Sequence, residues 1–165
     1  MRHIISILLQ NEAGALARVA ALFSSRGYNI ESLSVAPTEH SALSRLTLVT
    51  TGSDEVIAQI NTQLGKLVDV VTIADMTRDA HIERELLLMK VSVPEGNERK
   101  FEELVESAGA RALDDCPETY TVELTGANER MDEFIQRVGA VADILAVVRS
   151  GAMAIARGPQ VLKAG

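Results

Sequence analysis

The sequence predicts an α+β protein that consists of two tandem domains, each with the element order βαββαβ. Strand-like and helix-like segments alternate along the first half of the 165-residue chain, and the same succession starts again after a polar stretch. Several residues also recur at one constant spacing between the two halves. In this order both helices must cover one face of an antiparallel sheet, which is the ferredoxin-like arrangement.

The first domain is predicted from the periodicity of its apolar residues. His3–Leu9 is rich in Ile and Leu, as expected of a strand that is buried on both faces. Ala15–Arg26 carries apolar residues at helical spacing and is followed by Gly27, a residue type that commonly ends helices. Ser53 can cap a second helix, because its side chain can accept from a first-turn amide. The other predicted elements are the strands Ile30–Ala36, Leu43–Thr51 and Val68–Ile73, and a second helix with Val56, Ile57, Ile60 and Leu64 on its apolar face.

The second domain follows Asp75–Glu85, a polar segment that we interpret as the linker. We place the domains at residues 1–76 and 84–157, with the linker proper at 77–83 and a tail at 158–165. Gly151–Gly165 has little periodicity and is expected to be extended or partly disordered. The predicted elements are the strands Leu86–Val93, Arg111–Asp115, Tyr120–Thr125 and Ile144–Val148, with a loop at Pro117, and helices marked by Phe101, Leu104, Val105 and Ala108 and by Met131, Phe134, Ile135 and Val138.

Matching residues in the two halves indicate an internal duplication. The alternative is that two unrelated α/β domains agree by chance at a few turn positions, and we prefer duplication. Thr47, Thr51, Gly52, Glu55 and Asp69 match Thr121, Thr125, Gly126, Glu129 and Asp143 at the same offset.

Composition excludes several classes of protein. The net charge of −7 argues against a nucleic-acid partner, because nonspecific affinity for nucleic acids comes largely from Lys and Arg. The apolar runs are much shorter than the roughly 18 residues needed to span a bilayer, so no membrane partner is expected. A single cysteine, Cys116, leaves no internal disulfide framework. We therefore expect a cytoplasmic protein.

Residues suited to catalysis or metal binding are scattered. His3, His40 and His81 are far apart in the sequence, and no glycine-rich phosphate loop or nucleophile motif is present. Cys116 lies before Pro117 without an obvious activating partner. The sequence therefore predicts no catalytic residue and no metal site.

The segment between the first predicted strand and helix is the best candidate for a ligand site. Gly14 lets the backbone approach a guest closely, and the amides of the following helical turn suit a carboxylate. The side-chain oxygen of Asn11 could accept from an ammonium group, while Leu16 or Ile30 contacts an aliphatic side chain. The alternative is that Asn11 and Gly14 are ordinary turn and cap residues.

Asn29 is a second candidate, but it follows the first helix rather than preceding it. A helix of about twelve residues separates it from the Asn11 loop by about 15 to 18 Å. Asn11 and Asn29 can therefore meet in one site only across a dimer interface.

These segments resemble the small regulatory subunits of acetolactate synthase (acetohydroxyacid synthase), and the likeness extends over nearly the whole chain. It is most specific around residues 11–47. The segments that carry it are Asn11–Val19, Phe23–Leu33, Val35–Thr38, Leu43–Thr47, Leu64–Val71, Glu83–Leu86 and Arg149–Gly151.

The resemblance implies an N-terminal ACT domain, which is a ligand-binding βαββαβ module, and a C-terminal ACT-like domain. Such subunits form homodimers, bind the large catalytic subunit, raise its activity and confer feedback inhibition, usually by valine. No cofactor is expected in this chain; thiamine diphosphate, magnesium and FAD are expected in the catalytic partner. By motif, the valine pocket would comprise Asn11, Gly14, Ala15 and Leu16 of one protomer and Asn29 and Ile30 of its neighbour.

Three other functions are compatible with the same element order. A stand-alone amino-acid-sensing ACT protein would act without an enzyme partner. An RNA-binding module needs aromatic residues on its central strands, where this chain has Ile5, Ile7 and Leu9. A small hydrolase would need a nucleophile or a base, which the sequence does not offer. The loop at Pro94–Gly96 lacks the Asn and the matching Gly-x-Leu pattern of the first domain, so we expect no amino-acid site in the second domain.

Overall fold

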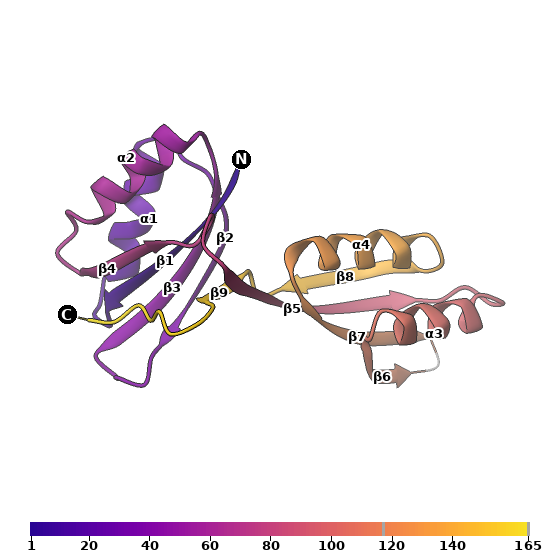
Figure 1. Cartoon of the computed structure of the whole chain (residues 1–165). Helices are drawn as coiled ribbons and strands as arrows, with labels where there is room; N and C mark the ends of the chain where they lie inside the picture. Colours follow the sequence, from indigo (N-terminus) through magenta and orange to yellow (C-terminus); the bar gives the residue numbers. More distant parts are fainter. Residues whose placement is uncertain (117, 165) are drawn as a thin grey trace. The chain divides into compact units, whose positions relative to one another are not determined.

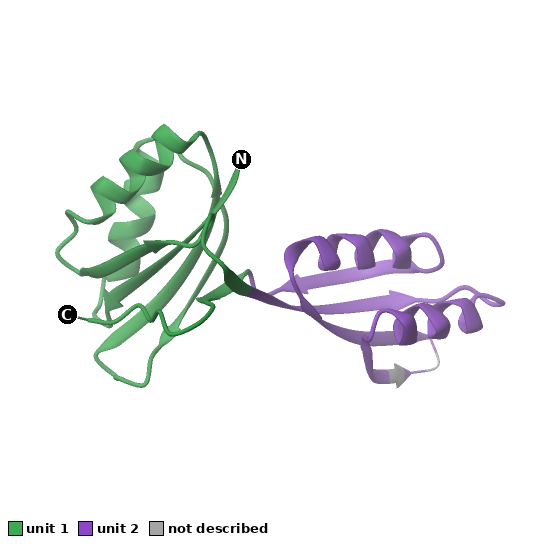
Figure 2. Cartoon of the chain, viewed as in Figure 1, with its two compact units in different colours: residues 1–82, 152–165 green, residues 83–151 purple. Residues whose placement is uncertain are grey.

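The computed structural model describes residues 1–116 and 118–164 of the chain (Figure 1). The predicted loop residue Pro117 and the last residue of the predicted tail lie outside the described residues. The described chain divides into two compact units (Figure 2). Unit 1 comprises residues 1–82 and 152–165, and unit 2 comprises residues 83–151.

Unit 1 has the predicted βαββαβ order, and its four strands form an antiparallel sheet in the order β2-β3-β1-β4. Both helices cover one face of this sheet (Figure 1). The predicted boundaries agree with the structure within about two residues, the closing strand starting at Val70 rather than Val68. The elements are β1 (Arg2–Gln10), α1 (Ala15–Ser25), β2 (Ile30–Pro37), β3 (Leu43–Thr51), α2 (Asp54–Leu64) and β4 (Val70–Asp75).

The core of unit 1 is built around β1, which lies inside the sheet and is buried on both faces, as its composition predicts. Ile5, Ile7 and Leu9 point to the helices and pack against Val19 and Phe23 of α1. The second helix starts as predicted, since the Ser53 hydroxyl accepts a hydrogen bond from the amide of Val56. The remaining buried residues of this cluster are Leu22, Leu46, Leu48, Ile57, Ile60 and Leu64.

Unit 2 repeats the same plan with an antiparallel sheet in the order β6-β7-β5-β8. Its core lies between this sheet and its two helices, around Phe101 and Phe134. The fold class predicted from the sequence is therefore confirmed for both halves. The elements are β5 (His81–Ser92), α3 (Glu98–Ser107), β6 (Arg111–Cys116), β7 (Thr119–Gly126), α4 (Asn128–Gly139) and β8 (Asp143–Arg149).

The linker is shorter than the polar composition suggests. β4 ends at Asp75 and β5 already begins at His81, so residues 81–85 are strand rather than linker. The reason is pairing with a strand near the C-terminus. Strand β9 (Met153–Ala156) pairs with β5, and the amide of Arg157 donates to the carbonyl oxygen of Ala80. A backbone ladder tolerates polar side chains that face solvent, and composition alone does not reveal this pairing.

The tail packs onto unit 1, although the sequence assigned residues 152–157 to the second domain and 158–165 to a separate tail. The expected extended conformation is confirmed at β9, but the packing was not predicted. Ala152 and Ala154 are buried against Ile4, Val49 and Met76. These last three residues lie on the sheet face opposite the helices, which we call the tail face.

Polar contacts fix the tail at both ends. The amide of Ala152 donates to the Ser32 hydroxyl at 3.0 Å, and the Arg45 guanidinium donates to the carbonyl oxygen of Leu162 at 2.9 Å. The tail therefore shields the tail face from water. A strand such as β1, which is apolar on both faces, must be shielded on both sides of the sheet.

Within unit 2, the buried carboxylate of Glu85 links the first strand of the unit to Arg149 near its last residue. Glu85 is 3% exposed, and both of its oxygens accept from Arg149, at 2.9 and 2.8 Å. Arg149 also donates to Asp132 at 2.8 Å. The hydrogen bonds that Arg149 donates to Glu85, together with the one to Asp132, raise the pKa of Arg149.

Deleting residues 152–165 should destabilise unit 1, because the deletion exposes Ile4, Val49 and Met76 to water. Burial of each such side chain contributes about 1.5 to 3 kcal/mol, so the Tm of unit 1 should fall by more than about 5 °C. Thermal unfolding followed by circular dichroism measures the shift. Deletion of residues 163–165 alone is the control and should leave the Tm unchanged. An unaltered Tm in the longer deletion would show that the tail does not contribute to this core.

Candidate functional site

The predicted ligand loop joins β1 to α1 and ends in a left-handed glycine. Gly14, at the N-cap of α1, has a φ of 85°, which an L-residue adopts only with strain. A Cβ atom at this position would also lie 2.8 Å from Nη1 of Arg18. The backbone angle therefore favours glycine at this point of the loop, and a larger residue would also displace the end of the Arg18 side chain.

The start of α1 presents amides that no backbone group uses. Ala15 donates to the carbonyl oxygen of Glu12 at 3.2 Å, and Arg18 donates to that of Gly14 at 3.0 Å. Within the described chain the intervening amides of Leu16 and Ala17 have no backbone acceptor. Such amides, at the positive end of the helix dipole, are suited to bind an anion.

No acidic side chain occupies the first turn of α1. This distinguishes it from the other helices of the described chain, because α2, α3 and α4 each have at least one carboxylate in the first turn. In those helices the carboxylate already partly neutralises the positive end. The start of α1 retains its positive potential for an external anion.

Asn11 is held so that one side of its amide group is engaged and the other is available. Its backbone amide donates to the carbonyl oxygen of Ala42 at 2.8 Å, and its side-chain NH2 donates to that of Ser41 at 2.8 Å. The side chain is exposed. Its oxygen is therefore the group that remains available to accept a hydrogen bond, and its predicted role toward an ammonium group stays a prediction.

An ion pair beside this loop was not predicted. Arg18 donates from Nε and Nη2 to the two carboxylate oxygens of Asp69, at 2.5 and 2.8 Å. The Asp69 side chain is only 6% exposed. Nη1 of Arg18 is not used by Asp69 and lies beside Gly14. The pair therefore connects α1 to the start of β4 and leaves one NH2 group at the ligand loop.

The hydrogen bond between Arg18 and Asp69 shifts the titration of both groups. It lowers the pKa of Asp69 below its ordinary value, despite partial desolvation of the carboxyl. It also raises the pKa of Arg18. Asp69 stood out in the sequence only because it matched Asp143 in the second half. A contact between residues so far apart along the chain has no local sequence signal.

Asn29 and Ile30 lie at the far end of α1 from the loop. Thr50 donates from its hydroxyl to the carbonyl oxygen of Asn29 at 2.6 Å, which fixes the backbone, while the Asn29 side chain is exposed. α1 has 11 residues, so about 16 Å separates its two ends. One protomer thus brings together Asn11, Gly14, Ala15 and Leu16, but not Asn29 and Ile30. Ala15 is buried at 3% exposure and can offer only its backbone.

The equivalent position in unit 2 has a different structure. At the start of α3 the amide of Gly96 donates to the Glu98 carboxylate at 2.8 Å, and the Asn97 side chain donates to the carbonyl oxygen of Val141 at 2.9 Å. A carboxylate of the chain thus already lies at this helix start. The expectation that unit 2 has no amino-acid site stays a prediction, and this geometry supports it.

The described part of the chain has neither a cluster of metal-binding side chains nor a membrane-spanning helix. No group of three or more His, Cys, Asp or Glu side chains there is placed to hold a metal ion. None of its helices is both long enough and apolar enough to cross a bilayer.

Comparison with known proteins assigns both halves of the chain. Residues 5–72 match the family described as the AHAS small subunit-like ACT domain, and residues 84–158 match the small subunit of acetolactate synthase. The acetolactate synthase isozyme 3 small subunits of Salmonella typhimurium and Escherichia coli are each 43% identical to the chain over 163 residues, which cover 99% of it and 100% of each relative.

A solved structure shows the same fold. The crystal structure of the acetolactate synthase small subunit from Thermotoga maritima superposes with a TM-score of 0.87 at 32% identity, over 97% of this chain and 99% of that one. Two tandem βαββαβ units, of which the first matches the ACT domain model, define a two-domain protein of the ACT class. Within that class, the chain belongs to the family of acetolactate synthase small subunits.

Replacing Asp69 with Asn should lower the Tm at pH 7, because the substitution removes the charge that pairs with Arg18. The pKa of Asp69 is lowered in the folded state, so the pair stabilises the fold at pH values above the ordinary carboxyl pKa of about 4. Its contribution is lost as the pH falls through the lowered pKa. The Tm difference between wild type and Asp69→Asn should therefore shrink on acidification.

Thermal unfolding between pH 3 and pH 7 measures this difference. Asp143→Asn changes the matching residue of unit 2, which is exposed and forms no ion pair in the described chain, and it serves as the control. A Tm difference for Asp69→Asn that does not depend on pH would contradict the assignment to the ion pair.

Proposed function

We propose that this chain is a regulatory subunit that binds and stimulates the catalytic subunit of acetolactate synthase and makes it sensitive to feedback inhibition by valine. Membership of the small-subunit family supports the partner. The observation that carries the effector site is the start of α1, where unpaired amides with no acidic side chain lie next to Asn11. Thiamine diphosphate, magnesium and FAD are then expected in the catalytic subunit.

Each part of an amino acid has a complementary group at this site. The carboxylate would accept from the amides of Leu16 and Ala17, and Nη1 of Arg18 adds positive potential beside Gly14. The oxygen of Asn11 would accept from the ammonium group. Leu16 is 38% exposed although it is apolar, and its side chain would contact the isopropyl group of valine.

Homodimerisation would complete the site through the edge of the first sheet. β2 is an edge strand of this sheet, so its outer backbone groups can pair with another strand. Two copies of one strand that pair about a twofold axis run antiparallel. Ile30 of one protomer then lies opposite the end of β2 near Pro37 of the other.

That pairing brings the separated residues to the same end of the dimer. Pro37 pairs with Ser44 and Gln10 pairs with Leu43, so the end of β2 and the Asn11 loop lie at one end of the sheet. Asn29 of the neighbour, which precedes its Ile30, would approach this end. Its exposed side chain could then hydrogen-bond a ligand that Asn11 and Leu16 already hold.

A ligand that bridges two protomers provides a physical basis for inhibition. Valine would favour the dimer arrangement in which both halves of the site are closed, and the catalytic subunit would be less active on that arrangement. Couplings of this kind are typically about 1 to 3 kcal/mol. One methylene group in an apolar pocket is worth a similar amount, so isoleucine and leucine are expected to bind with different affinity rather than to be excluded.

A stand-alone amino-acid sensor is the second candidate function. The same helix start would bind the same ligand, but no catalytic subunit would be required. Co-purification of the chain with an acetolactate synthase catalytic subunit separates the two functions. Recovery of a complex whose activity rises on addition of the chain supports the regulatory subunit.

Asn11→Ala should strongly weaken valine binding and relieve valine inhibition while the chain remains folded. The substitution removes the acceptor for the ammonium group, and a hydrogen bond to a charged group contributes enough for a roughly 10- to 100-fold loss of affinity. Calorimetric titration of the isolated chain with L-valine measures binding. Activity of the reconstituted enzyme, with and without valine, measures inhibition.

Asn97→Ala is the matched control, because it removes the same side chain from the start of α3, where we expect no amino-acid site. It should bind valine as the wild type does. Asn11→Ala should still stimulate the catalytic subunit. Undiminished valine binding by Asn11→Ala would rule out the proposed site.

A further inference from the structure

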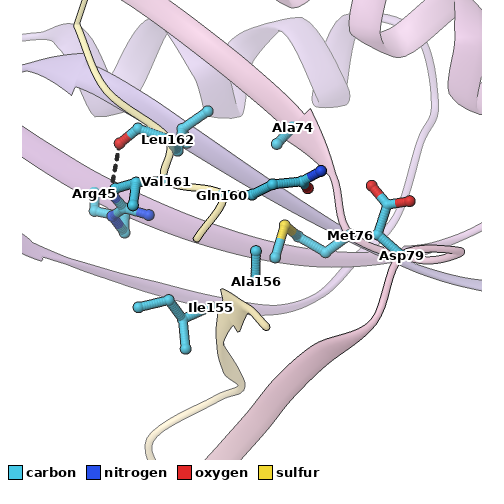
Figure 3. Close-up of a pocket in the computed structure, with 9 residues that line it drawn as sticks. All are labelled: Arg45, Ala74, Met76, Asp79, Ile155, Ala156, Gln160, Val161 and Leu162. Carbon is cyan, nitrogen blue, oxygen red and sulfur yellow. Dashed lines mark hydrogen bonds between the residues drawn. The ribbon is translucent and has the colours of Figure 1, made fainter. Parts of the chain in front are cut away.

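A cavity lies on the tail face of unit 1, on the opposite side of the sheet from the helices. It lies between the tail and the tail face (Figure 3), is partly open to solvent and has a volume of about 150 Å³. Ala74 and Met76 come from β4 and the residue after it, and Ile155 and Ala156 come from the tail. All of these residues belong to unit 1, so the cavity is formed within one compact unit.

Among the described residues that line this cavity, Arg45 is the one with a guanidinium, and most of its donors have no partner there. Nη2 donates to the carbonyl oxygen of Leu162 (Figure 3). A guanidinium has five N–H donors, and no carboxylate of the described chain pairs with this half-buried group. Its planar fork matches a carboxylate in geometry as well as in charge.

The rest of the cavity is mostly apolar, and small residues keep it open. Ala74 and Ala156 lie at strand positions, where larger β-branched residues would reduce the space. Met76 is 5% exposed and adapts its shape easily. An apolar cavity of about 150 Å³ can hold a molecule the size of benzene, so a branched chain of about five carbons fits this volume.

The charges of the cavity are unevenly distributed. Arg45 lies at one end and Asp79 at the other, with Met76 and Gln160 between them (Figure 3). A ligand carboxylate is therefore favoured at the Arg45 end and repelled at the Asp79 end. An α-amino acid would have to place its ammonium group beside Arg45, which disfavours amino acids at this site.

We propose that this cavity binds a small aliphatic monocarboxylate, with its carboxylate on Arg45 and its alkyl group against Ala74 and Met76. The occupant would contact the sheet and the tail together and would stabilise the tail in its bound position. This site is separate from the start of α1, where Asn11 provides an acceptor for an amino group. The two sites thus select different classes of carboxylate, and neither depends on the other.

The test uses the full chain with carbon-13 in the methionine methyl groups. The signal of Met76 is assigned with Met76→Leu, and the chain is titrated with 3-methylbutanoate. We expect a saturable shift of the Met76 signal. The shift should require a concentration at least about tenfold higher in Arg45→Gln, because a charge-assisted hydrogen-bond pair is lost. It should be absent in Ala74→Ile, which fills the cavity without removing a charge.

Four comparisons, two variants and two ligands, make the result specific. Arg26→Gln removes an exposed guanidinium of the same unit outside the cavity and should bind as the wild type does. Asn11→Ala should also retain binding, which separates this site from the effector site. 3-Methylbutylamine has the same five-carbon skeleton with an amine in place of the carboxylate, and L-leucine carries the same 2-methylpropyl group on an α-amino acid; both should shift the Met76 signal much less.

The proposal is overturned if 3-methylbutanoate gives no saturable shift at Met76. It is also overturned if the shift persists unchanged in Arg45→Gln and Ala74→Ile, or if the amine shifts the signal as strongly as the acid. Loss of binding in Asn11→Ala would assign the carboxylate to the effector site instead.

Discussion

The structure of the first unit depends on one constraint, which is that its inner strand β1 is apolar on both faces. Ile5, Ile7 and Leu9 face the helices, whereas Ile4 and Leu8 face the other way, and all five are nearly inaccessible to water. Two helices cover the first face. The second face is covered by the C-terminal tail, which follows the whole of unit 2 in the sequence.

Both candidate ligand sites follow from the way β1 is covered. β1 ends at Gln10, and the loop from there to α1 presents the helix start with its unused amides. On the tail face, the cover is a short segment rich in alanine, and it leaves a cavity beside Arg45. The first site offers acceptors and donors for a zwitterion, and the second offers a cation and apolar surface. Burial of a single strand thus positions two chemically different sites.

Much of the fold could be predicted because its signals are local. Periods of 2 and 3.6 residues predict strands and helices, and residues such as Gly27 and Ser53 mark helix ends. The candidate ligand loop could be proposed from the sequence for the same reason, since Asn11, Gly14 and Leu16 are neighbours in the sequence. Asn29 was correctly placed at the other end of α1, because helix length follows from residue count.

The unpredicted features are contacts between distant parts of the chain. The pairing of Arg18 with Asp69 leaves no periodic signal, and each residue alone reads as a solvated charge. The tail was unpredictable for a related reason: Ala152 and Ala154 are too small and too few to mark an apolar stripe. Their burial depends on Ile4 and Val49, which lie more than half the chain away. The polar composition of residues 81–85 did not predict that β5 starts at His81 rather than at Leu86. The early start depends on pairing with β9, which polar side chains do not indicate.

The central claim is that the effector site is shared between two protomers, and a mixed dimer tests it most directly. Asn11→Ala and Asn29→Ala chains that carry different affinity tags are co-expressed, and the heterodimer is isolated by two successive purifications. Each homodimer should fail to bind L-valine in calorimetry, because both of its sites lack one asparagine. The heterodimer should bind about one valine, half the wild-type stoichiometry, because one of its two sites has both residues. A heterodimer that binds no valine, or an Asn29→Ala homodimer that binds it normally, would contradict a shared site.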